Sequence, residues 1–174
     1  MLEPITIELN LHPLAWRVIQ RECCANKIAE DKVIYDVKGT WIYEAIKLGL
    51  RKKRDSGKST VPDKYKSGNV YVCQRDFFRR GSYLAIDNQI LISQALVKIE
   101  KDKLCREIAS AHIYSGVPVG TAIRYLILKY MYENDEISWH TLKKHYQRHG
   151  KPYEQELQID FEELVLKKKP KQTH

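Results

Sequence analysis

Long hydrophobic runs are missing from this sequence of 174 residues. No stretch approaches the roughly 18 apolar residues that a membrane-spanning helix requires, so we expect no membrane partner. The first residues also lack the basic and then apolar order of a secretory signal, because Glu3 comes early and an alternating pattern starts at Ile5. These absences predict a cytoplasmic protein.

Cysteine is scarce, and the residue patterns of common catalytic and metal sites are missing. The four cysteines show no CxxC spacing, and we expect buried free thiols at Cys23, Cys24, Cys73 and Cys105. His145 and His149 are four residues apart, but no cysteine pair or HExxH-like pattern completes a metal site. The sequence contains neither GxSxG nor the acidic cluster of a two-metal nuclease. We therefore predict no metal, no cofactor and no catalytic residue, and the absences favour a protein that is not an enzyme.

The composition is that of a folded globular chain. Hydrophobic residues make up 43% and charged residues 30%, which excludes global disorder. Eleven tyrosines stand out, because tyrosine packs an apolar ring while its hydroxyl stays polar and so suits contact surfaces.

Positive charge is concentrated in the middle of the chain. The net charge is +8, and residues 51–80 alone contain ten Lys and Arg against three Asp and Glu, a net of +7. Such a density attracts polyanions, because binding releases the counterions of the phosphates. The alternative is a solvated loop whose charge only maintains solubility. A short basic tail, residues 167–171, repeats the pattern.

Hydrophobic periodicity predicts an α+β fold, with a small mixed sheet and helices in the N-terminal half and a helical C-terminal half. In the N-terminal half we expect strands over 5–9, 33–37 and 70–72, and helices over 13–24 and 40–50. Residues 51–68 have few apolar side chains, which predicts a long connection or a projecting hairpin.

In the C-terminal half we expect four helices, over 87–99, 102–116, 119–132 and 139–149, and a strand over 157–161. These elements suggest three regions of one compact domain. They are a mixed region 1–81, a helical region 82–152, and a return strand with a basic tail, 153–174.

Residues 104–128 form a helix, the turn Ser115-Gly116-Val117-Pro118 and a second helix. This arrangement resembles the helix-turn-helix of many transcription factors, whose second helix enters the major groove. The resemblance implies that the groove-facing side holds Val119, Thr121, Arg124 and Tyr125, with Lys129 near a phosphate. The alternative is ordinary core packing of two helices joined by a short turn.

The helix over 139–149 interleaves aromatic and basic residues, which suits phosphate contact or base stacking. We therefore predict a nucleic-acid-binding protein with DNA rather than RNA as its partner, such as a transcriptional regulator or an accessory factor of a phage or mobile element. The predicted contact residues are Arg51, Lys52, Lys53, Arg54, Lys58, Arg75, Arg79, Arg80, Thr121, Arg124, Lys143, Lys144 and Arg148.

Two other classes of function stay open. The first is a structural or assembly protein of a larger complex, such as a virion component, with the basic segment and aromatic residues in its interface. That class implies a homo-oligomer or a protein partner. The second is an enzyme with an unfamiliar site.

Overall fold

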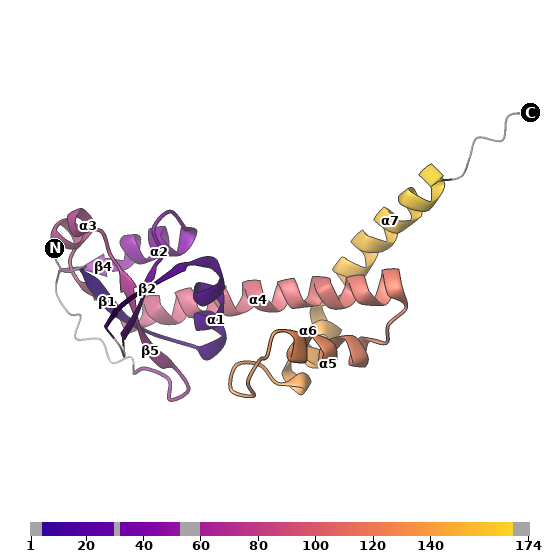
Figure 1. Ribbon diagram of the computed structural model, residues 1–174, viewed down its shortest axis with the longest axis horizontal. Coiled ribbons are helices and arrows are strands. Elements are labelled where there is room, and N and C mark those ends of the chain that lie inside the picture. Colours follow the sequence, from indigo (N-terminus) through magenta and orange to yellow (C-terminus); the bar gives the residue numbers. More distant parts are fainter. Residues whose placement is uncertain (1–4, 30–31, 53–59, 169–174) are drawn as a thin grey trace, which may run out of the picture. The chain divides into compact units, whose positions relative to one another are not determined.

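The computed structural model describes residues 5–29, 32–52 and 60–168, and of 24–29, 32 and 164–168 only the backbone (Figure 1). The chain divides into two compact units, Met1–Lys98 and Ile99–His174, which we call unit 1 and unit 2. Unit 1 contains the strands and unit 2 is helical, so the predicted α+β class is confirmed.

A four-stranded mixed sheet forms the centre of unit 1, in the order β1-β5-β3-β2. β1 (Thr6–Leu11) pairs antiparallel with β5 (Lys66–Tyr71), which pairs parallel with β3 (Lys32–Asp36), and β2 (Cys24–Ala29) completes the sheet. The alternation in β1 buries Ile7, Leu9 and Leu11.

Two helices supply most of the remaining core of unit 1. α1 (Pro13–Glu22) begins with a proline, whose missing N–H is no loss in the first turn. α2 (Trp41–Gly49) is capped by Thr40, whose hydroxyl accepts a hydrogen bond from the Tyr43 N–H. Both helices bury their apolar stripe with the side chains of β1.

Three short elements follow α2 and lie beside each other. β4 (Leu50–Arg51) pairs antiparallel with β6 (Tyr83–Leu84), and α3 (Gln74–Arg80) lies between them in the sequence. None of the three was predicted from the sequence, because each is too short to show a period.

The first turns of α4 (Ile86–Ser115) bond to β1 within unit 1. The buried Gln89 accepts a hydrogen bond from the Asn10 N–H at 2.7 Å, and its amide donates to the Leu84 carbonyl at 2.8 Å. Ser93, fully buried, accepts from the His12 N–H at 2.9 Å. These bonds satisfy polar groups that would be costly to bury unpaired.

Unit 2 is formed by the second half of α4 with α5 (Val119–Lys129), α6 (Trp139–His149) and α7 (Lys151–Lys168). Its buried apolar side chains come from the first three of these helices and from Ile137 just before α6. Those on the helices are Leu104, Cys105, Ile108, Ala109, Ala122, Ile123, Leu126, Leu142 and Tyr146. The predicted helices over 119–132 and 139–149 are confirmed, the first ending slightly earlier, and Ser138 caps the second as expected.

The two helices predicted over 87–99 and 102–116 are a single helix, α4. Asp102 does not cap a new helix, because nothing interrupts the backbone before it. No proline or glycine occurs between Ile86 and Ser115, so the i to i−4 hydrogen bonds continue. The helix ends where Gly116 adopts a positive φ of 64°.

The strand predicted over 157–161 is wrong, because these residues belong to α7. Gly150 keeps helical angles, φ −76° and ψ −32°, so it does not stop the chain from entering another helix. Pro152 lies in the first turn of that helix, where proline is tolerated. The alternation of three apolar residues was too short to identify a strand.

In unit 1 the structure adds β2 and extends β5 backwards into the predicted connection over 51–68. Gly68 lies in the middle of β5, where a Cβ atom would come within 2.5 Å of the Trp16 ring. The Trp16 indole N–H donates to the Lys66 carbonyl at 2.8 Å. Glycine at this position thus serves the close packing of Trp16 on the strand rather than a turn.

Candidate nucleic-acid interface

Gly81, directly after α3, packs against the backbone at the start of the basic segment of unit 1. A Cβ atom on Gly81 would lie 2.1 Å from the Arg51 carbonyl oxygen and 2.5 Å from the Lys52 nitrogen. Two groups of basic residues that lie about 28 positions apart in the sequence therefore meet. The first is Arg51 of β4 with the following Lys52, and the second is Arg79 and Arg80 of α3. We call these four residues the β4–α3 basic cluster.

A buried tyrosine fixes the other end of α3. The Tyr43 hydroxyl of α2 donates to the Asp76 carboxylate at 2.6 Å and accepts from the Cys73 N–H at 3.2 Å. Burial raises the pKa of the Tyr43 hydroxyl, and its hydrogen bond to Asp76 raises it further, so the hydroxyl stays protonated as a donor. Both ends of α3 are thus attached to α2 and β4.

The arginines of the β4–α3 basic cluster differ in how they are used. Arg51 donates to the carbonyls of Leu48 and Leu50, and Arg80 donates to the Lys47 carbonyl at 3.4 Å. These two guanidinium groups therefore help to hold the backbone. Lys52 and Arg79 are exposed, and neither forms an ion pair with a carboxylate of the described residues.

Four other residues of this segment were predicted to contact nucleic acid. Arg75 is exposed on α3, also without an ion pair to any carboxylate that the structure describes. Lys53, Arg54 and Lys58 lie outside the described residues.

In unit 2, Trp139 at the start of α6 lies beside cations from two helices. The Arg124 guanidinium of α5 is 5.9 Å from the centre of the indole ring, and the Lys143 ammonium, one turn along α6, is 4.7 Å from it. The indole N–H donates to the Gly120 carbonyl at 3.3 Å, which fixes the ring against α5. We call Arg124, Trp139 and Lys143 the Trp139 cluster.

A second face of α6 also presents cations. Lys144 and Arg148 are four residues apart, so they lie on one helical face about 6 Å apart along the axis. Both are exposed, and the part of the chain that the structure describes offers neither of them a carboxylate partner. Of the predicted α6 contact residues, Lys143 thus lies beside the same ring as Arg124, whereas Lys144 and Arg148 lie on another face of the helix.

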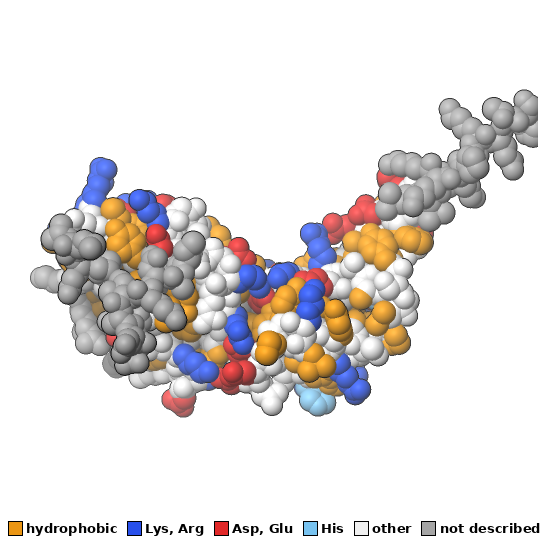
Figure 2. Space-filling model, viewed as in Figure 1, with side chains coloured by type: hydrophobic (Ala, Val, Ile, Leu, Met, Phe, Trp, Pro, Cys, Tyr) orange, Lys and Arg blue, Asp and Glu red, His pale blue; other side chains and the backbone are white. Residues whose placement is uncertain are grey.

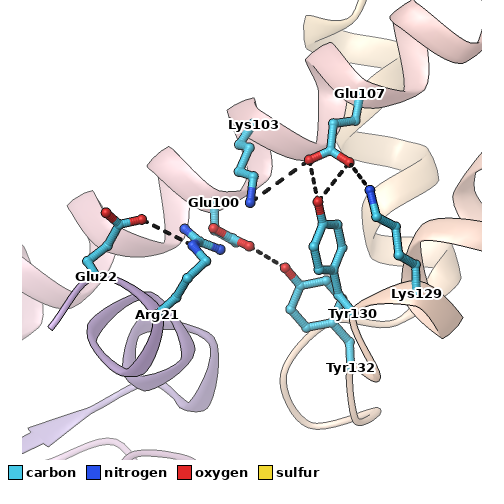
Figure 3. A network of polar contacts seen from close by, with 8 residues as sticks. All are labelled: Arg21, Glu22, Glu100, Lys103, Glu107, Lys129, Tyr130 and Tyr132. Carbon is cyan, nitrogen blue, oxygen red and sulfur yellow. Dashed lines mark hydrogen bonds and ion pairs between the residues drawn. The ribbon is translucent and has the colours of Figure 1, made fainter. Parts of the chain in front are cut away.

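Other cations of the protein are neutralised internally. The Glu107 carboxylate of α4 accepts a hydrogen bond from the Tyr130 hydroxyl at 2.6 Å and pairs with Lys129 at 3.3 Å and Lys103 at 3.9 Å (Figure 3). Tyr132 similarly donates to the buried Glu100. Lys129, which the resemblance placed near a phosphate, is therefore committed to Glu107.

A groove of about 550 Å³ between α4 and α5 was not expected from the sequence. Its lining includes Ala111, Tyr114, Thr121 and Tyr125. Thr121 faces this groove, whereas Arg124 contacts Trp139, so the two predicted base-reading residues of α5 have different neighbours. No sequence motif marks the groove, because it arises from the angle between two helices.

In the view of Figure 2, hydrophobic side chains and a smaller number of basic ones lie next to each other on the surface of unit 2. The helices and turn of the predicted helix-turn-helix are present as the end of α4, residues 116–118 and α5. Docking of α5 in a major groove stays a prediction.

The described residues show neither a metal site nor a membrane-spanning helix. No group of three or more His, Cys, Asp and Glu side chains there is suited to hold a metal ion. In the same part of the chain, no helix has both the length and the apolar character needed to cross a bilayer. Comparisons of the chain with protein-family models, with curated proteins and with solved structures gave no match.

Proposed function

We propose that the protein is a non-catalytic nucleic-acid-binding protein, acting as a transcriptional regulator or accessory factor. The observation that supports this proposal is the set of exposed cations for which the described residues supply no carboxylate: Lys52, Arg75, Arg79, Lys144 and Arg148. A cation whose charge is not compensated internally is available to replace the counterions of a phosphate. Arg51 and Arg80 position the segment, and the Trp139 cluster adds an aromatic surface.

Salt dependence tests the proposal. Binding of the full chain to labelled DNA should weaken at least about tenfold between about 50 and 200 mM salt, because several phosphates are neutralised. Arg79→Ala and Lys144→Ala should each weaken binding and reduce the slope of log K against log salt by about 0.9.

Matched controls separate local contact from net charge. Arg106 pairs with Glu156 at 3.0 Å and Lys47 pairs with Glu44 at 2.6 Å. Arg106→Ala and Lys47→Ala remove the same charge as the two test variants but should leave affinity nearly unchanged. If the controls weaken binding as much as Arg79→Ala and Lys144→Ala do, affinity for DNA depends only on the net charge of the protein, and the proposed interface is wrong.

The second candidate function is that of an assembly protein, and it is favoured by exposed apolar residues on α7. Ile159 is 59% exposed and Phe161 38% exposed on a helix that also presents Glu156, Asp160 and Glu162. Such a mixture of exposed apolar and acidic side chains suits a protein partner better than a phosphate backbone. Light scattering at several protein concentrations tests this candidate. An assembly protein should form a defined oligomer, and Ile159→Lys should dissociate it.

A further inference from the structure

The C-terminal part of the exposed side of α5 is poorly suited to reading a duplex. Tyr125, Leu128 and the following Met131 are 63%, 75% and 77% exposed. A major groove presents hydrogen-bond donors and acceptors on base edges, and Leu128 and Met131 offer no donor to match them. The apolar faces of the bases are accessible only where a strand is unpaired.

The Trp139 cluster places groups for both parts of a nucleotide next to each other. The indole N–H bond to the Gly120 carbonyl holds the aromatic ring in place, and the His140 ring lies 5.0 Å from it at 87°. Lys143 and Arg124 supply positive charge within 6 Å of the same ring. An aromatic surface bordered by cations is what single-strand-binding grooves use to stack bases and track the backbone.

The cations do not block the ring permanently. A cation–π contact at a partly exposed site contributes only about 0.5–1 kcal/mol. Lys143 can therefore leave the ring to pair with a phosphate, which opens the ring face for a base. Arg124 can make the same exchange from the side of α5.

We propose that unit 2 binds single-stranded nucleic acid. One unpaired base stacks on Trp139, where Arg124 and Lys143 bind the adjacent phosphates. A further base stacks on Tyr125, which lies on the neighbouring side of α5 along the α4–α5 groove. This proposal rests on the proposed function and specifies its substrate. It differs from the helix-turn-helix interpretation, in which a base pair is read from the major groove.

The experiment measures fluorescence anisotropy of the full chain with a labelled strand of about 20 nucleotides and with the duplex of the same sequence. The single strand should bind more tightly than the duplex. Trp139→Leu and Tyr125→Ala should each weaken single-strand binding by about fivefold or more, the effect of removing one stacking side chain. Trp139→Phe keeps an aromatic face and should restore most of the affinity.

Trp41 provides the matched control, because it is 47% exposed on α2 of unit 1. Trp41→Leu should leave single-strand affinity unchanged. Thermal melting of each variant verifies folding, and Tyr125→Ala, at an exposed position, remains informative if Trp139→Leu unfolds.

Two results would overturn the inference. The first is tighter binding to the duplex, and the second is a loss with Tyr125→Ala no greater than with Trp41→Leu. In either case, steep salt dependence together with losses for Arg79→Ala and Lys144→Ala would leave the proposed function standing. If neither strand form binds, both proposals fail.

Discussion

Gly81 is the position where the addition of a single methyl group should destabilise the fold most. Its φ of 112° and ψ of −177° lie in a region that is essentially restricted to glycine. The neighbouring backbone of Arg51 and Lys52 occupies the space where a Cβ atom would project, at 2.1–2.5 Å. Real Cβ contacts essentially never fall under 3.0 Å, so the backbone of β4 or α3 must move.

The expected cost of Gly81→Ala follows from these two effects. Holding an L-residue in this region of φ and ψ costs about 1–3 kcal/mol. Displacing β4 also weakens its two-residue ladder with β6, and each lost hydrogen bond contributes about 1 kcal/mol. We therefore expect a loss of about 3–5 kcal/mol in the free energy of unfolding of unit 1, a large part of the stability of an ordinary domain.

Gly39→Ala is the matched control, because Gly39 also has a positive φ, 81°, but nothing lies within 4 Å of its would-be Cβ. It should cost only about 1–2 kcal/mol, the conformational part alone. Urea denaturation followed by circular dichroism gives both values. Equal losses for the two variants would show that Gly81 is not packed against Arg51 and would remove the basis of the β4–α3 basic cluster.

Two further predictions concern ionisable groups of unit 2. Desolvation lowers the pKa of His145 below 6.5 although Asp102 lies 3.5 Å away. As the pH falls, the unfolded chain therefore takes up a proton at His145 before the folded chain does. The free energy of unfolding should be fully retained above about pH 6.5 and should decrease below it. Urea titrations should show a smaller decrease for His145→Asn than for the exposed control His140→Asn. Burial raises the pKa of the Cys105 thiol to about 12, so alkylation at pH 8 followed by mass spectrometry should modify Cys105 only after unfolding, and rapid labelling of the native chain at Cys105 would contradict its buried position.

The regular elements were predictable where a periodic pattern was long or a cap was clear. Alternation identified β1, and the caps Thr40 and Ser138 located α2 and α6 correctly. The failures have local causes. Asp102 resembled a cap although α4 continues through it, and the alternation from Leu157 to Phe161 was also compatible with a helix. Short segments do not distinguish these alternatives, because the neighbouring chain decides between them.

The candidate interface was predictable in composition but not in geometry. The sequence was enough to select Arg79, Lys144 and Arg124 as candidate contact residues. It did not indicate that Arg124 lies beside Trp139, which the structure shows. Nothing in the sequence indicated that Gly81 would bring the two ends of the basic segment together. That contact depends on tertiary packing of a glycine that looks like an ordinary helix end.

The positive charge of α3 is not neutralised within the helix, because its acidic residue bonds to a different group. Asp76 lies on α3 among Arg75, Arg79 and Arg80, and an ion pair with one of them would reduce the positive field. Instead its carboxylate accepts the Tyr43 hydroxyl, a neutral donor, while Arg80 donates to a backbone carbonyl. In unit 2, by contrast, Glu107 and Glu156 neutralise Lys129 and Arg106. A count of charged residues therefore overstates the positive charge available for binding in unit 2 more than it does in α3. In unit 1, mutation of Arg75 or Arg79 should weaken phosphate binding first.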